Sequence, residues 1–400
     1  MSRRGRLDVV VVGGGVVGAA SALMLAREGL QVALVEAQRP AAWTREQRDL
    51  RVFAFAPDNA SLLAQLGVWG TVSASRAQPY RGMRVWDAAG GEPLVFDADA
   101  LGERQLGWIV ENAVLVDALW QALPAAGVRV HCPARVAQLE QMDAGVRIGL
   151  DDGLVLDARL AIAADGGHSA LRRLAGIEAP VHDYQQRGVV AFVASEVAHR
   201  HTCWQRFLPT GPVAFLPFSA DGDAALEGRL GSIVWTLPSD EAQRLLDAPT
   251  AQFENELSAA FGGELGALTL QSARAAFPLR RQLAQRQRAG HVLLVGDAAH
   301  VMHPLAGQGV NHGLRDVSAL QASMQAAKAD GADPISPTRL ARWARTRKSD
   351  NALGAYSFEA INRVFSNEAM LPTLLRGPLL GIAGRLPPLT RALWRHAAGK

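Results

Sequence analysis

The chain has 400 residues, of which 49% are hydrophobic and 20% are charged, and its formal net charge is +3. This length favours two or three domains, and the lack of repeats and low-complexity tracts indicates an ordinary globular protein. With only two cysteines, Cys132 and Cys203, a disulfide framework is excluded and a reducing, cytoplasmic setting is predicted.

A dinucleotide-binding fingerprint opens the chain. The segment from Leu7 to Glu36 contains an apolar run suited to a buried parallel strand, three spaced glycines, an Ala/Leu-rich helical pattern and a second apolar run. In this fingerprint Gly13 allows a tight turn, Gly15 lets a pyrophosphate approach the backbone, and Gly18 lets the helix pack on the strand. The helix N-terminus supplies free N–H groups, and Glu36 is placed to accept ribose hydroxyls.

A signal peptide or membrane anchor is the alternative for this stretch, because Arg3, Arg4 and Arg6 precede an almost wholly apolar segment. Three glycines in register and a carboxylate that closes a second strand are not expected of a signal sequence. The fingerprint is therefore the preferred interpretation.

The middle of the chain mixes helical and antiparallel patterns. A polar connection to about Arg51 leads into a helix near 57–66, and helical spacing returns at 112–123. Residues 81–96 are typical of a hairpin with its turn at 89–91. Short strands are expected at 128–130, 136–139, 146–150, 154–156 and 160–164.

The turn Asp165-Gly166 follows the last of these strands and leads into a new helix. Residues 184–280 favour strands again, including 213–218 and 231–237, with one helix near 241–261. This region is predicted to form the larger part of a mixed-sheet substrate domain.

The α/β pattern returns at Gly290 with a buried strand, the acidic turn Gly296-Asp297, a proline-glycine loop and another helix. Residues 337–365 are predicted to form one long helix, and 371–396 shorter helices broken by prolines. Because arginines interrupt the apolar residues of this last part, no span there is long enough to cross a bilayer.

Positive charge is concentrated at the C-terminus. Residues 336–400 contain eleven Lys/Arg and three Asp/Glu, a local charge of +8, so the rest of the chain carries −5. One interpretation is an arginine-rich helical layer that pairs with the acidic remainder, and the other is attraction to anionic phospholipid. Nucleic-acid binding is not expected, because no known reading motif accompanies the basic residues.

Three acidic turns, at Glu36, Asp165 and Asp297, each close a short apolar strand. In a parallel sheet such turns lie at the same edge, where the carboxyl ends of strands meet a ligand. Carboxylates there suit ribose and ribityl hydroxyls better than phosphates.

The sequence resembles a known family at these turns. The motifs GGGVVG, ADGGHSALRR and GDAAHVMHPLAGQGVN are similar to those of the single-component flavin aromatic hydroxylases. Within that group PYRGMRVWD, VENAVLVDALWQAL, WQRFLPTGPVAFLPF and HPLAGQGVNHGLRDV most resemble the ubiquinone-biosynthesis ring hydroxylases, in particular the member that acts on the methylated methoxy-benzoquinol. Sister enzymes act on neighbouring ring positions with similar motifs, so the ring position stays open.

The resemblance implies an α/β fold like that of para-hydroxybenzoate hydroxylase, with a Rossmann-type FAD-binding domain, an interleaved mixed β-sheet substrate domain and a C-terminal helical region. The expected FAD-binding domain is discontinuous and comprises residues 1–78, 98–182 and 282–335. The expected substrate domain comprises 79–97 and 183–281, and the helical region 336–400.

The resemblance also implies extended FAD and a transient visit by NADH or NADPH, which has no Rossmann domain of its own because only one fingerprint is present. Arg51 matches the family's arginine beside the cofactor, Asn112 the polar residue that opens a helix, and Asp165 the acid thought to serve both nucleotides. The full set of expected cofactor-binding residues is Gly13, Gly15, Gly18, Glu36, Arg51, Asn112, Asp165, Gly166, Gly296, Asp297, Gly309, Val310 and Asn311.

For the substrate, Pro304 resembles the family's proline whose carbonyl faces the ring. Phe215, Pro217 and Trp235 are candidates for the apolar wall opposite, with core packing as the alternative. No general base is assigned, and structural roles are the alternative for His300 and His303, which lie in the flavin loop.

A metal site is not expected. His199, His201 and Cys203 alternate as three ligands on one strand face could, but no fourth ligand is near in sequence. A strand start is the preferred interpretation for Cys203.

The sequence thus predicts an NAD(P)H-dependent FAD monooxygenase that uses O2 to hydroxylate a hydrophobic, polyprenylated phenol or quinol. The alternatives are hydroxylation of another ring position or another phenol, and a non-catalytic FAD-binding scaffold of a quinone-synthesis complex. Residues 336–400 could contact that complex or the inner face of the membrane, so the expected location is cytoplasmic or peripheral at the membrane.

Overall fold

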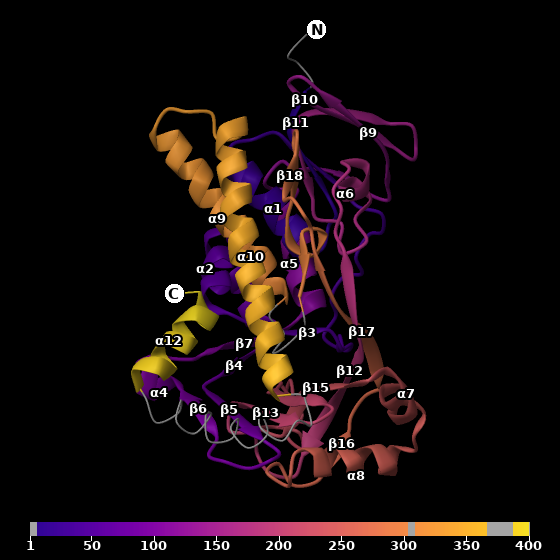
Figure 1. The fold of residues 1–400 in the computed structure, drawn as a ribbon, viewed down its shortest axis with the longest axis vertical. Coiled ribbons are helices and arrows are strands. Elements are labelled where there is room, and N and C mark those ends of the chain that lie inside the picture. The colour runs from indigo at the N-terminus through magenta and orange to yellow at the C-terminus, as the bar shows by residue number, and fades with distance from the viewer. Residues whose placement is uncertain (1–5, 303–308, 366–386, 400) are drawn as a thin grey trace.

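The computed structural model describes residues 6–302, 309–365 and 387–399. An eight-stranded sheet occupies the upper part of the molecule and a nine-stranded sheet the lower part, with a small three-stranded sheet between them (Figure 1). This is the α/β architecture with mixed sheets that the sequence predicts.

The eight-stranded sheet has the order β18-β19-β11-β1-β2-β8, in which β8, β2, β1, β11 and β19 are parallel. Residues 9–12 of β1 and 32–35 of β2 form continuous apolar runs because helices and other elements bury both faces of the sheet there. The strands are β1 Leu7–Val12, β2 Val32–Val35, β8 Arg129–His131, β9 Val136–Met142, β10 Gly145–Leu150, β11 Val155–Ala163, β18 Arg288–Ala289 and β19 Val292–Leu294.

The prediction of two strands at 154–156 and 160–164 is wrong, because β11 is a single strand over this range. The polar residues Asp157 and Arg159 do not interrupt it, because they alternate with buried Leu156, Ala158 and Leu160. The Asp157 carboxylate accepts hydrogen bonds from Arg147 of the neighbouring strand β10.

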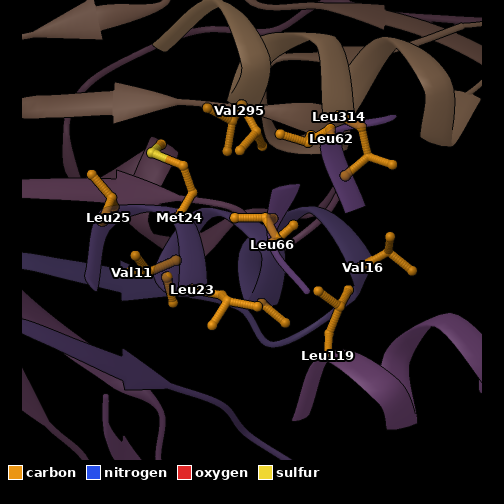
Figure 2. Close-up of a cluster of buried hydrophobic side chains, with 14 of the residues drawn as sticks. Val11, Val16, Leu23, Met24, Leu25, Leu62, Leu66, Leu119, Val295 and Leu314 are labelled. Atoms are coloured by element: carbon orange, nitrogen blue, oxygen red, sulfur yellow. The ribbon is translucent and has the colours of Figure 1, made fainter. Parts of the chain in front are cut away.

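Helix α1 packs between β1 and the helices α5 and α9, and their apolar side chains form the largest core (Figure 2). Helix α10 spans the range predicted for one long helix and contacts α9 and β18. The helices around this sheet are α1 Val16–Arg27, α2 Pro57–Gln65, α3 Trp69–Ala74, α5 Asn112–Ala122, α6 Ala170–Leu174, α9 Gly309–Ala329 and α10 Pro337–Phe365, with a 3-10 turn at Gly296–Ala298.

The nine-stranded sheet has the order β20-β17-β12-β15-β14-β13-β5-β6, with β16 paired to β12. The predicted hairpin is confirmed, because β5 and β6 pair antiparallel, and β5 joins the sheet through a parallel pairing with β13. The strands are β5 Gly82–Asp87, β6 Leu94–Asp97, β12 Val181–Ser195, β13 Thr202–Leu208, β14 Gly211–Pro217, β15 Leu230–Pro238, β16 Leu268–Leu270, β17 Ala275–Leu283 and β20 His300–Val301.

Two helices cover one face of this sheet where the sequence predicted one. Helix α7 is Ser239–Asp247 and helix α8 is Thr250–Ala260. The break falls at Ala248, which is extended at ψ 148°. Pro249 follows it, and a proline both lacks an N–H group and disfavours a helical conformation in the residue before it.

The small sheet joins the two large ones. It consists of β3 Val52–Phe55, β7 Gly107–Glu111 and β4 Ala77–Tyr80, in the order β3-β7-β4. Nearby, helix α4 Ala98–Leu101 packs against Trp394 of helix α12 Pro387–Ala398. None of the helices in the described ranges combines the length and the apolar character that a bilayer crossing requires.

Candidate functional site

A cavity of about 770 Å³ lies beyond the carboxyl ends of the parallel strands β1, β2, β11 and β19. The three acidic turns predicted to share a sheet edge meet there, as expected for an open α/β sheet. Ten of the expected cofactor-binding residues line this cavity: Gly13, Gly15, Glu36, Arg51, Asn112, Asp165, Gly166, Asp297, Gly309 and Val310.

The other three expected residues, Gly18, Gly296 and Asn311, lie behind the lining. A Cβ atom on Gly18 would overlap the Gly13 carbonyl, so this glycine serves the close packing of α1 on the turn. Asn311 is fully buried, and its side chain donates to Ala54 O at 2.7 Å and accepts from Ala56 N at 3.0 Å. The side chain of Asn311 therefore fixes the end of β3, a role that its sequence position did not indicate.

The glycine turn leaves an open approach to the start of α1. Gly13 has φ +103°, a left-handed conformation that glycine tolerates, whereas the Cβ position of Gly15 is open to more than 4 Å from the other described segments of the chain. Gly15 is the N-cap of α1 and no side chain caps the helix, so the first N–H groups have no partner within the helix. Sequence reasoning missed Trp120 of α5, whose Nε1 donates to Gly14 O at 2.7 Å and holds the turn.

Two carboxylates at the cavity orient the neighbouring backbone. Glu36 accepts hydrogen bonds from the N–H groups of Gly14 and Gln38, at 2.5 and 2.9 Å. Asp165 uses Oδ2 to accept from Ala170 and Leu171 at the start of α6, while its Oδ1 is buried with no partner among the described residues. A ligand hydroxyl at that point would satisfy the orphaned oxygen.

Buried Arg172 ties two of the turns together. It is 5% exposed, and its guanidinium donates to Ala298 O and Gly167 O, both at 2.8 Å. Burial lowers the pKa of Arg172, although Asp165 opposes that shift. The residue lies inside a motif quoted above, but only the fold shows which carbonyls it binds.

A buried cluster around Asp316 supports the Gly296-Asp297 turn from behind. Asp316, on α9, is fully buried and accepts from Gly296 N at 3.0 Å, His300 Nε2 at 2.6 Å and Arg347 Nε of α10 at 2.8 Å. Burial raises the pKa of Asp316, but His300 and Arg347 outweigh burial and bring it to about 2. His300 is therefore a structural partner of this carboxylate.

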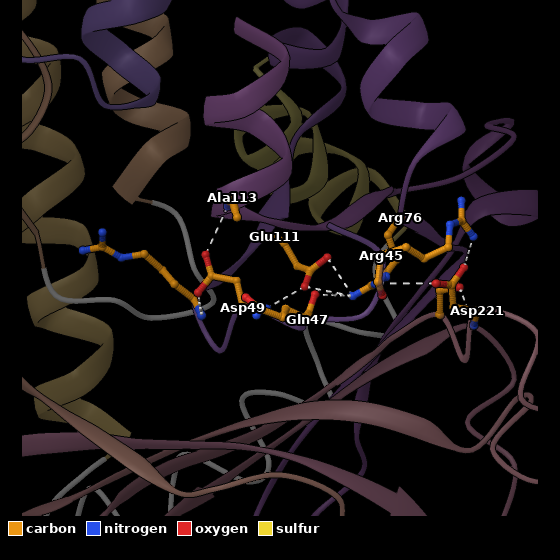
Figure 3. A network of polar contacts seen from close by, with 9 residues as sticks. Arg45, Gln47, Asp49, Arg76, Glu111, Ala113 and Asp221 are labelled. Atoms are coloured by element: carbon orange, nitrogen blue, oxygen red, sulfur yellow. Dashed lines mark hydrogen bonds and ion pairs between the residues drawn. The ribbon is translucent and has the colours of Figure 1, made fainter. Parts of the chain in front are cut away.

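A second buried cluster contains Glu111 and Arg76 (Figure 3), and it supports Arg51 through Asp49. Glu111, the last residue of β7, accepts from Asp49 N at 2.7 Å and pairs with Arg76 Nη1 at 3.2 Å. Arg76 also pairs with Asp221, which lies between β14 and β15. Burial raises the pKa of Glu111, because the Asp49 N–H and the charge of Arg76 only partly offset it.

The expected substrate wall needs a correction. Phe215 and Trp235 lie in the core that helices α7 and α8 cover, and Phe215 approaches Phe261 with ring centroids 6.5 Å apart. Pro217 lies two residues after Phe215 in β14, so its side chain faces the same side of the sheet. The opposite face of the sheet turns toward the small sheet through Phe192, Leu216 and Phe218, which pack with Ala54 and Ile109.

Two expected residues, Pro304 and His303, lie outside the described ranges. His199 Nδ1 accepts from His201 N at 3.1 Å, and burial lowers the pKa of His199 to about 4. Within the described part of the chain no three His, Cys, Asp or Glu side chains are grouped to hold a metal ion. Cys203 lies in strand β13, as preferred from the sequence.

Comparisons with known proteins agree with this geometry. A family model described as an FAD binding domain matches residues 6–342. The chain is 38% identical to ubiquinone hydroxylase UbiL of Rhodospirillum rubrum, covering 98% of this chain and 89% of that one. It is 37% identical to 3-demethoxyubiquinol 3-hydroxylase of Escherichia coli, covering 98% of each chain. Among solved structures, p-nitrophenol 4-monooxygenase PnpA of Pseudomonas putida has a TM-score of 0.77 at 20% identity, covering 98% of this chain and 97% of that one.

Proposed function

Since this chain belongs to the family of FAD-dependent monooxygenases that includes the ubiquinone hydroxylases, we propose that it hydroxylates the ring of a polyprenylated ubiquinone precursor. NAD(P)H is the proposed electron donor and O2 the proposed oxygen source. The proposed substrate is a demethoxyubiquinol, the compound in the name of the Escherichia coli relative. One observation carries the proposal: the cavity at the sheet edge brings together acceptors and backbone donors that suit a flavin dinucleotide.

The residues fit FAD in a defined order. Glu36 would accept ribose hydroxyls while it holds Gly14, and the uncapped start of α1 at Gly15 would bind the pyrophosphate. The orphaned Oδ1 of Asp165 would accept a hydroxyl of the ligand. Arg51 and Asn112 line the same cavity from the side of the small sheet.

When bound, the flavin supplies the redox and oxygen-transfer chemistry. The chain would contribute charge stabilisation, because α9 begins at Gly309 and Val310 beside the cavity and a helix N-terminus favours a nearby anion. Phe192, Leu216 and Phe218 of the nine-stranded sheet pack with Ala54 and Ile109 of the small sheet, and this apolar contact would keep water away from that side of the site.

Peripheral contact with the membrane is part of the proposal for a polyprenylated substrate. Residues 336–400 carry the excess positive charge, which favours anionic phospholipid. On α12 the side chains of Arg391, Leu393 and Arg395 are exposed, whereas Trp394 is buried.

Quinone analysis of a deletion strain tests the reaction. We expect an accumulated intermediate that lacks one ring hydroxyl, and we expect the wild-type chain to restore the quinone. An Asp165→Ala chain should fail to restore it and should bind FAD about 10-fold or more weakly. Asp152→Ala is the control, because Asp152 is exposed in the turn before β11.

The purified protein gives the second measurement. The precursor should stimulate NAD(P)H oxidation and appear as an oxygenated product. Unchanged quinone in a strain without a redundant hydroxylase would contradict the proposed role. Bound FAD that no pyridine nucleotide reduces would favour the scaffold alternative.

A further inference from the structure

We infer that Arg76 and Asp221, which pair with each other (Figure 3), are positioning residues. They couple the β14–β15 connection of the nine-stranded sheet to Arg51 at the cavity. The inference rests on the proposed function in one respect, namely that Arg51 contacts the bound flavin. It concerns residues that the sequence motifs did not include.

Arg51 is held by its backbone. The Asp49 carboxylate accepts from Arg51 N at 2.9 Å with Oδ1 and from Ala113 N at 3.1 Å with Oδ2. The Arg51 carbonyl accepts from Asn112 N at 2.8 Å. These bonds connect Arg51 to the first residues of α5, and Arg51 and Asn112 both line the cavity.

Buried Arg76 fixes the segment that leads to Asp49. Its side chain is 1% exposed and donates to the carbonyls of Arg45 and Gln47, the latter at 3.2 Å. The same guanidinium pairs with Glu111, which accepts from Asp49 N. Because water cannot replace these partners at a buried guanidinium, the segment 45–49 depends on the position of Arg76.

Asp221 brings the other sheet into this network. Its carboxylate lies 3.4 Å from Arg76 Nη2 and also pairs with Arg45 Nη1. Asp221 has φ +57°, a left-handed conformation that is uncommon for residues other than glycine, although Asp is enriched there. Residue pairs of opposite charge on the two sides thus hold the connection between β14 and β15 against the segment 45–49.

These contacts define how a change at Asp221 would alter flavin binding at Arg51. Loss of the Asp221 charge leaves Glu111 as the acidic partner of Arg76, beside the carbonyls of Arg45 and Gln47, and removes the partner of the Arg45 side chain. The segment 45–49 thereby loses one restraint. Arg51 then samples more positions at the cavity, and flavin binding weakens. A change in the β14–β15 connection would reach the flavin by the same contacts.

A double-mutant cycle on FAD affinity tests the route in the full-length apoprotein, by flavin fluorescence and without aromatic substrate. We expect Asp221→Asn to raise the Kd for FAD about 3- to 10-fold, since one charged partner of Arg76 is lost. Asp223→Asn is the matched control from the same connection, where the exposed carboxylate accepts from the nearby Ala225 N at 3.0 Å, and should change the Kd less than about 1.5-fold. Arg45→Gln, at a side chain that is 55% exposed, should reproduce part of the Asp221 effect.

The decisive measurement is made in the Arg51→Ala background. There Asp221→Asn should change the Kd by less than about 2-fold, because the residue through which it acts is gone. The inference would be overturned if the fold-changes in Kd of the two single variants multiply in the double variant. It would also be overturned if Asp221→Asn changes the Kd no more than the Asp223→Asn control. If Arg51→Ala leaves the Kd unchanged, the inference fails while the proposed hydroxylation stands. An unchanged quinone in the deletion strain would contradict the proposed hydroxylation but would not affect the result of the double-mutant cycle, which measures FAD affinity alone.

Discussion

Two fully buried carboxylates stand behind the cavity, and they differ in how their charge is balanced. Asp316 has a pKa lowered to about 2, whereas the pKa of Glu111 is raised. Burial raises the pKa of both. At Asp316, however, His300 and Arg347 outweigh burial, while Glu111 shares its cation, Arg76, with Asp221.

The comparison teaches that burial alone does not decide whether an internal carboxyl stays ionised. The polar partners decide, because the contacts of Asp316 with His300 and Arg347 outweigh burial, whereas those of Glu111 with Arg76 and the Asp49 N–H only partly offset it. The Asp316 cluster is therefore a fixed support for the Gly296-Asp297 turn. The Glu111 cluster is less firmly charged, which suits a network that transmits a change.

Removal of the Asp316 carboxylate should have the largest effect. Asp316→Ala removes the buried carboxylate that His300 and Arg347 share and leaves Arg347 with Asp350 and Asn351, and we expect a loss of about 3–5 kcal/mol in the free energy of unfolding. Denaturant titration measures it. Asp330→Ala removes the exposed ion pair with Arg339 and should cost about 0–1 kcal/mol. Equal losses in the two variants would break the comparison.

The pH dependence of Asp316 should be the next largest effect. Because the pKa of Asp316 in the folded chain lies below the ordinary aspartate value of 3.8, the contribution of Asp316 to stability is complete above about pH 4 and is lost as pH falls toward 2. The difference between wild type and Asp316→Asn should shrink by about 2 kcal/mol over that window. Denaturant titrations at several pH values follow it, and a difference that stays constant would contradict the lowered pKa.

Neutralisation of Glu111 should have the smallest effect. Glu111→Gln keeps the shape and leaves Arg76 paired with Asp221, so we expect a loss of about 1 kcal/mol in the free energy of unfolding at neutral pH. The sign of the pH dependence is opposite to that of Asp316. Because the pKa of Glu111 is raised in the folded chain, Glu111 contributes stability that is present below pH 4.5 and is lost as the pH rises. The difference in the free energy of unfolding between wild type and Glu111→Gln should therefore become smaller as the pH rises. Denaturant titrations at several pH values measure this difference, and a difference that becomes larger as the pH rises would contradict the raised pKa of Glu111.

Local sequence patterns predicted the flavin side of the molecule well. The glycines at 13 and 15, the acidic turns and the helix start at Gly309 all line one cavity, because strand, turn and helix patterns are read within about 30 residues. The same local rules placed α5 and the long helix α10. They failed at Ala248, where Pro249 separates two helices in a stretch expected to form one.

The substrate side and the supports behind the cavity could not be predicted in this way. Alternation along β14 shows that Phe215 and Leu216 face opposite sides, but only the sheet order shows which side carries helices α7 and α8. Arg76, Glu111 and Asp221 come from three distant segments, and no spacing along the chain indicates that they meet.

The sequence by itself therefore determined the strand and helix types, the positions of the turns and the chemical nature of the ligand that the turns suit. These depend on residues that are neighbours along the chain. The tertiary structure alone decided which face of the nine-stranded sheet meets the small sheet and which buried charges neutralise one another. Those outcomes depend on contacts between residues that are not neighbours along the chain, such as Arg76 with Asp221 and His300 with Asp316, and their energies arise only when burial brings the segments together.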